Sequence, residues 1–197
     1  MFTAKDVMTL RQRTGAGMME AKKALEENNG DMDKAAEFLR IKGIAKADKR
    51  AGKQTSEGVI TSYVHHNGRV GVLVEVNCET DFVARTDDFK NLAKEIALHI
   101  ASAAPVAVDK DGVPVEKVDE ARRIAEGQAK ESGKPDNIVQ RMVEGKVESY
   151  YKDNCLLYQP WIREPKKSIG DLIKEASAKV GENIQVRRFV RFQMGEE

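Results

Sequence analysis

The sequence has few of the residues that carry disulfide, metal or membrane chemistry. Its 197 residues include only two cysteines, Cys78 and Cys155, which lie far apart and match no metal-ligand spacing. We interpret both as reduced, buried thiols of a cytosolic protein. The longest apolar stretches, such as 70–76, are far too short to cross a bilayer. The N-terminus has no basic segment leading into an apolar run, so we expect no secretory signal and a cytoplasmic location.

The chain also lacks an excess of charge of either sign. Lys and Arg total 33 and Asp and Glu total 32, which leaves a formal net charge of +1 at pH 7. A protein that binds chiefly a phosphate backbone carries a large basic excess. Aromatic residues make up 6% of the chain and offer few platforms for base stacking. We therefore expect no direct binding of nucleic acid.

No constellation of catalytic residues is visible. His65 and His66 are neighbours on a predicted strand, so we expect their side chains on opposite faces, where they cannot share a metal ion. The glycine turn at 14–17 lacks the Lys-Ser/Thr of a phosphate-binding loop. No serine lies in a nucleophile elbow. We predict no metal site, no cofactor and no enzymatic activity, and we interpret the chain as a binding protein.

The first 43 residues predict a module of three short helices. Thr3 and Asp6 have the spacing of a capping box, and Phe2 can pack on Val7 as a hydrophobic staple. The helices are separated by the glycine turn at 14–17 and by the Asn-Asn-Gly at 28–30, and Gly43 is expected to end the third. Three short amphipathic helices with glycine stops are typical of a ubiquitin-associated-type (UBA-like) module, which we place at residues 1–43.

The rest of the chain predicts a linker and an α+β core. Residues 44–56 are rich in Ala and Lys and predict a basic, solvated linker helix. Residues 57–197 predict the core domain. Its expected elements are a hairpin with the two-residue turn Asn67-Gly68, a long amphipathic helix from Asp87 to Pro105, helices near 116–131 and 135–151, a helix capped by Ser168 and Asp171, and a third strand at 184–192. A small antiparallel sheet of about three strands packed with helices is the predicted fold class, α+β.

The segment from Thr80 to Val83 leaves the hairpin and precedes the long helix. On general grounds Phe82 would be a core residue, since an isolated Phe is usually buried, and Thr80 or Asp81 would cap a helical turn. A turn position also allows the side chains to project outward. The residues alone leave both interpretations open.

Two long motifs resemble signatures of the elongation factor Ts family. Residues 10–25 (LRQRTGAGMMEAKKAL) are similar to its N-terminal signature, and residues 75–85 (EVNCETDFVAR) to its second signature. The shorter motifs at 181–184 (GENI) and 187–189 (RRF) fit as well. The similarity covers nearly the whole chain in the same order.

The resemblance implies a guanine nucleotide exchange factor that binds elongation factor Tu, both GDP-bound and nucleotide-free, and displaces Mg²⁺ so that GDP leaves and GTP can bind. It implies that the three-helix module docks on the GTPase domain of Tu, with contacts expected from Leu10, Thr14, Met18, Met19 and Lys22. It further implies that a second set of residues disturbs the magnesium ion, namely Thr80, Asp81, Phe82 and Val83. On this basis Phe82 contacts the partner and not its own core.

The chain is shorter than the long members of that family, which carry two related halves in the core. A single unit with about three strands leaves one sheet face under-covered, so we expect a noncovalent homodimer and a Tu₂Ts₂ complex. The C-terminal strand carries Val186, Val190 and Phe192 on one face, interrupted by Arg188, which could pair with an acidic residue of the other subunit. It contains no cysteine that could cross-link two copies.

Two alternatives stay open. The three-helix module could belong to an adaptor that binds ubiquitin-like proteins or peptides, although such an adaptor has no reason to carry the turn at 80–83. The basic residues between Lys46 and Lys53 could serve an RNA-binding translation accessory, against which the near-zero net charge and sparse aromatics count.

Overall fold

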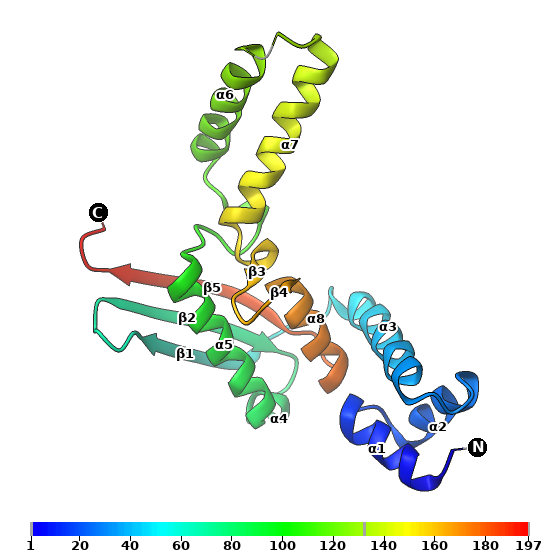
Figure 1. The fold of residues 1–197 in the computed structure, drawn as a ribbon. Coiled ribbons are helices and arrows are strands. Elements are labelled where there is room, and N and C mark those ends of the chain that lie inside the picture. The colour runs from blue at the N-terminus through cyan, green and yellow to red at the C-terminus, as the bar shows by residue number, and fades with distance from the viewer. Residues whose placement is uncertain (1, 132, 197) are drawn as a thin grey trace. The chain divides into compact units, whose positions relative to one another are not determined.

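A computed structural model describes residues 2–131 and 133–196 (Figure 1). Within them it contains eight α-helices and a three-stranded antiparallel sheet, which confirms the predicted α+β class. The elements are α1 Ala4–Thr14, α2 Met18–Glu27, α3 Met32–Arg50, β1 Glu57–Val64, β2 Val70–Cys78, α4 Asp81–Ala84, α5 Asp87–Ala103, α6 Val115–Glu131, α7 Asp136–Asn154, β3 Pro160–Trp161, β4 Glu164–Ser168, α8 Ile169–Val180 and β5 Gln185–Gln193, with 3₁₀ turns at Lys110–Gly112 and Leu156–Tyr158. No helix of this described part is long and apolar enough to span a membrane.

The chain divides into two compact units that interleave along the sequence. The first unit comprises residues 2–60, 75–93 and 172–186, and the second comprises 61–74, 94–171 and 187–196. Both the sheet and α5 are therefore shared between the units. The boundaries 1–43, 44–56 and 57–197 remain a prediction.

The N-terminal helices form a small core of their own within the first unit. The capping box is present, since the Thr3 hydroxyl accepts from Asp6 N–H and the Asp6 carboxylate accepts from Thr3 N–H. Gly15 ends α1 in the left-handed conformation (φ 71°). The buried residues of this core are Val7, Leu10, Ala21, Ala24, Leu25, Ala35 and Leu39, against which Phe2 packs.

The third helix does not end at Gly43, and the prediction that it would is wrong. α3 continues as one helix to Arg50, so most of the predicted linker helix is its second half. A glycine ends a helix by adopting positive φ, and Gly43 is not among the residues that do so. Gly43 serves close packing, because a Cβ built there would lie 3.0 Å from Ala178 Cβ on α8.

The three-stranded sheet has the order β1-β2-β5. Along β2, Val72, Val74 and Val76 are buried while Leu73 between them is half exposed, as the alternation of a strand requires. The long helix α5 is amphipathic. Its buried stripe consists of Phe89, Leu92, Ala93, Ile96, Ala97 and Ile100.

The hairpin turn differs from the predicted two-residue type. Only Gly68 has positive φ (68°), His65 O accepts from Gly68 N–H, and the Asn67 side chain accepts from Arg69 N–H. This Asn turn lengthens the loop and takes His65 and His66 out of the strand, which ends at Val64. Their rings lie 4.2 Å apart, so the expectation that they point to opposite faces is wrong.

The second unit contains a helical hairpin and a buried group of hydrogen bonds centred on Gln159. α6 and α7 pack through Ala125, Ala129 and Val143, and a two-stranded ribbon β3-β4 that the sequence patterns did not predict follows them. His99 is fully buried and donates from Nε2 to Gln159 Oε1 (3.0 Å). The Gln159 amide donates in turn to the carbonyls of Ala103 and Asp153. Burial lowers the pKa of His99, so its imidazole is held neutral.

Gly43→Ala should lower the free energy of unfolding by about 1 kcal/mol, because the new methyl group overpacks the contact with Ala178. Gly145→Ala in α7 is the matched control: nothing lies within 4 Å of its added Cβ, and helix propensity should raise stability by about 0.5 kcal/mol. Thermal or chemical unfolding measures both. If Gly43→Ala stabilised the protein, the packing role would be contradicted. It would also be contradicted if adding Ala178→Gly to Gly43→Ala did not reduce the loss of stability.

Candidate functional site

Phe82 is the most exposed large apolar side chain in the described part of the molecule. Its residue surface is 78% accessible. It lies on the single helical turn α4, and Thr80 is the N-cap of that turn, accepting from Val83 N–H through its hydroxyl (3.4 Å). The capping role foreseen for Thr80 is present, but the interpretation of Phe82 as a core residue is wrong.

The other side chains of this segment, hereafter the Phe82 turn (residues 80–83), hold it together. Asp81 is half-buried and forms an ion pair with Arg85 one turn later (2.8 Å). Val83 is half-buried, and Ala84, which ends α4, is buried. The turn therefore presents one aromatic ring to solvent and directs its remaining apolar groups inward.

Glu182, which lies about a hundred residues away in sequence, accepts hydrogen bonds from the start of the turn. Its Oε2 accepts from the backbone N–H of Glu79 and of Thr80, both at 3.1 Å. Its Oε1 accepts from the Thr80 hydroxyl at 2.6 Å. Because that hydroxyl donates its proton to Glu182, its lone pairs are free to accept from Val83 N–H. A carboxylate that accepts backbone N–H groups at a helix start also complements the helix dipole.

Glu79 makes the reciprocal set of contacts. Its carboxylate accepts from Asn183 N–H (2.7 Å) and binds both Nε and Nη2 of Arg50 (3.1 and 2.8 Å). The side-chain amide of Asn183 donates to the backbone carbonyls of Ala51 and Lys53, just after α3. We call Glu79 and Glu182 the carboxylate clamp.

The contacts of the clamp shift the pKa values of its charged groups. Hydrogen bonds from Arg50, then from Asn183 N–H, hold the pKa of Glu79 below its usual range. The ion pair raises the pKa of Arg50. Beside the clamp the buried thiol of Cys78 lies 3.2 Å from Thr80 O, and burial raises its pKa to about 11. Cys78 is thus a neutral packing residue and not a nucleophile.

Sequence reasoning missed the clamp. The sequence pattern places Arg50 in a solvated linker helix, and it gives Glu182 and Asn183 only as part of the short motif at 181–184. The available signal was the presence of an acidic residue in both motifs that resemble the family. Nothing in the spacing of 79 and 182 indicates that they meet.

The residues expected to dock a partner divide into exposed and buried ones. Met19 is 74% exposed and Met18 44%, and Lys22 is exposed one turn further along α2. Thr14 is half-buried, and its hydroxyl donates to Leu10 O and accepts from Ala16 N–H, which closes the turn before α2. Leu10 is fully buried in the three-helix core, so it supports this surface and is not a contact residue.

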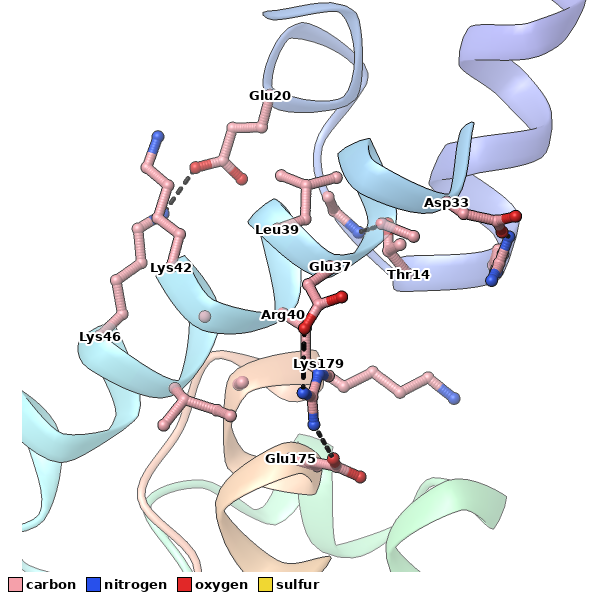
Figure 2. A pocket seen from close by; sticks show the side chains of 16 residues that line it. Thr14, Glu20, Asp33, Glu37, Leu39, Arg40, Lys42, Lys46, Glu175 and Lys179 are labelled. Carbon is pink, nitrogen blue, oxygen red and sulfur yellow. Dashed lines mark hydrogen bonds and ion pairs between the residues drawn. The ribbon is translucent and has the colours of Figure 1, made fainter. Parts of the chain in front are cut away.

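A cavity of about 550 Å³ opens beside these helices in the first unit. Figure 2 shows Arg40 of α3 reaching between Glu37 and Glu175, and the side chains of Lys42 and Lys46 along the same helix. The cations and carboxylates on its wall are largely paired with one another, so the cavity carries no concentrated charge that would select an ionic ligand.

What this arrangement can do chemically is to present a rigidly capped aromatic ring and a pair of adaptable methionines. Among residues 2–131 and 133–196 no group of three or more His, Cys, Asp or Glu side chains is placed to hold a metal ion. Exposed aromatic and thioether side chains are of the kinds that protein-binding surfaces use.

Comparison with known proteins identifies the family. The family model described as elongation factor TS matches residues 3–196. The chain is 56% identical to elongation factor Ts of Fervidobacterium nodosum, with 99% of each chain covered. It is 55% identical to that of Thermoanaerobacter sp. (strain X514), covering the whole of this chain and 96% of the relative. The class is therefore that of translation elongation factors, and the chain belongs to the elongation factor Ts family.

The lowered pKa of Glu79 predicts a specific acid sensitivity. A carboxyl group whose pKa is lower in the folded state stabilises the fold above its unfolded pKa, and that stabilisation is lost as the pH falls through the folded pKa. Unfolding measured from pH 7 down to pH 3 should therefore show a stability loss below about pH 4.5 that is smaller in Glu79→Gln. If the free energy of unfolding fell equally with pH in the parent and in Glu79→Gln, the Glu79 carboxylate would not stabilise the fold through these contacts.

Proposed function

We propose that this chain is a guanine nucleotide exchange factor for elongation factor Tu, acting in the cytoplasm. It binds Tu·GDP, displaces Mg²⁺ and promotes release of GDP so that GTP can bind; it makes and breaks no covalent bond. The observation that carries the proposal is the Phe82 ring, exposed on a capped turn within the motif that resembles the family's second signature. A large aromatic ring exposed to water is available to fill a pocket on a binding partner.

Docking of the three-helix module supplies the binding energy in this mechanism. Met18 and Met19 follow the glycine turn at the start of α2 and are exposed, and thioether side chains adapt to irregular apolar surfaces. Lys22 adds a charge at the edge of the same patch. These contacts bring the Phe82 turn to the nucleotide site of the GTPase domain.

Phe82 and Asp81 then act on the partner beside its magnesium ion. GDP is held by phosphate-loop amides and by Mg²⁺ bridging to its β-phosphate. A ring wedged next to the ligands of the ion favours a partner conformation in which they no longer align, so Mg²⁺ leaves and GDP follows. Coupling between two ligands of one protein is reciprocal. A thousandfold weakening of GDP binding requires about 4 kcal/mol, which a few well-packed anchors can supply.

Phe82→Ala tests the function directly. Release of a fluorescent GDP analogue from Tu at saturating factor should slow by at least about tenfold, since the wedge is gone. The melting temperature should stay within about 2 °C, because an exposed Phe contributes little of the roughly 3–5 kcal/mol that deleting a core Phe costs. Normal exchange with a large loss of stability would overturn the proposal.

Met19→Ala is the matched variant for docking. It should raise the factor concentration that gives half-maximal exchange and leave the maximal rate near the parent value, since it removes affinity without touching the wedge. A fall in the maximal rate alone would contradict the division of roles.

We further propose that two copies associate noncovalently, so that the complex with Tu is Tu₂Ts₂. In the second unit the strands carry four large apolar side chains that are 40% to 70% exposed, namely Val64, Leu73, Val190 and Phe192. Val186, expected on the same face, is buried. Apolar strand side chains left in water offer a surface that a second copy can cover symmetrically.

Phe192→Asp tests the association. Light scattering of the parent at micromolar concentration should give about twice the 21.9 kDa chain mass, unchanged by reductant because both cysteines are buried. Phe192→Asp should shift the mass toward the monomer, since a carboxylate would have to be desolvated in the interface. Ile124→Asp, which also charges an exposed apolar position, should leave the mass unchanged. A monomeric parent would refute the dimer.

A further inference from the structure

The Phe82 turn has only a few contacts of its own, namely the Thr80 cap and the ion pair between Asp81 and Arg85. α4 is four residues long, and an isolated single turn is unstable because few of its hydrogen bonds are internal. Two backbone N–H groups leading into it, those of Glu79 and Thr80, find their acceptor on Glu182. A residue outside the motif therefore holds the backbone that leads into the turn carrying the exposed ring.

The same contacts join the turn to the three-helix module. Arg50, which binds the Glu79 carboxylate, is the last residue of α3. The other end of α3 contributes Ala35 and Leu39 to the core of the module. At about 1.5 Å per residue, its 19 residues form one unbroken rod of roughly 28 Å between the docking surface and the turn.

α3 is also held along its length within the first unit. Arg40 pairs with Glu175 (3.1 Å), as Figure 2 shows, and Asp48 pairs with Lys174 (3.0 Å). Between them Gly43 allows close approach to Ala178 of α8. These contacts on α8 resist sliding or rotation of the rod, so its C-terminal residue presents the guanidinium to Glu79 at a defined place.

We propose that Glu182 and the Arg50–Glu79 pair are positioning residues that hold the Phe82 turn at a fixed place relative to the docking module. The inference rests on the exchange function proposed above. It adds to it how docking of the three-helix module places the Phe82 ring. If the clamp is loosened, Phe82 samples several orientations, and only the competent fraction can act on the partner. Loss of the clamp then lowers the rate of nucleotide release from the bound complex and spares the affinity of the complex.

Glu182→Gln tests the role with little change of shape. One of its two oxygens becomes an NH₂ group, which cannot accept from backbone N–H or from the Thr80 hydroxyl. The maximal rate of GDP-analogue release from Tu should fall by roughly tenfold, while the half-saturating concentration changes by less than about twofold. Arg50→Gln should give the same pattern to a smaller degree.

A double-mutant cycle with Phe82→Ala separates this role from a general loss of structure. If Glu182 acts through the ring, Glu182→Gln should slow release by less than about twofold once the ring is absent. Glu95→Gln is the matched control, because it breaks a similar two-contact pair, with Arg163 in the second unit, and should leave both exchange parameters unchanged. Thermal unfolding confirms that each variant is folded.

Each outcome of the cycle decides one question. An equal slowing by Glu182→Gln in the presence and absence of the ring would overturn the positioning role while leaving the wedge intact. A rise in the half-saturating concentration without a fall in the maximal rate would overturn it as well. If Phe82→Ala alone does not affect GDP release, the proposed function itself fails. This single variant is therefore measured before the double variant.

Discussion

Two consecutive backbone N–H groups, those of Glu79 and Thr80, point at one carboxylate oxygen of Glu182. The start of a helix always leaves such donors without partners inside the helix. Both donors precede the four residues of α4, so the contact with Glu182 fixes the backbone that leads into the turn. Thr80, whose hydroxyl also donates to Glu182, caps the turn that carries the exposed ring, and the buried thiol of Cys78 lies beside the carbonyl of Thr80.

The first unit combines this fixed turn with large apolar side chains whose exposure to water is unfavourable. Phe82 and Met19 each expose about three quarters of their surface, although burying such side chains is the main favourable term in folding. The arrangement is tolerable because the fold does not rely on them: the three-helix core is closed by Leu10 and Leu25, and the turn is held by charged hydrogen bonds. Apolar groups not needed for stability remain available for a partner.

Much of the fold could be predicted because it depends on neighbours in sequence. The boxes Thr3–Asp6 and Ser168–Asp171 formed as their spacing indicated, and the apolar stripe of α5 follows the helical repeat. The strands near 59–65, 70–76 and 184–192 follow from alternation. The family, too, was recognisable from motifs long enough to be specific. Local patterns work here because caps, periodicity and motif order are properties of contiguous residues.

Local patterns are therefore enough to predict the α+β class, most of the helices and strands in their order, and the family, and the motif at 75–85 points to the Phe82 turn. The exposure of Phe82, the burial of Leu10, the passage of α3 through Gly43 and the contact between Glu182 and Thr80 became visible only in the folded chain. Each of these depends on which surfaces come together across a hundred residues or more, or on what a helix packs against. No local propensity encodes that information, because a glycine or a glutamate has the same preferences whether or not Ala178 or a free N–H group lies opposite.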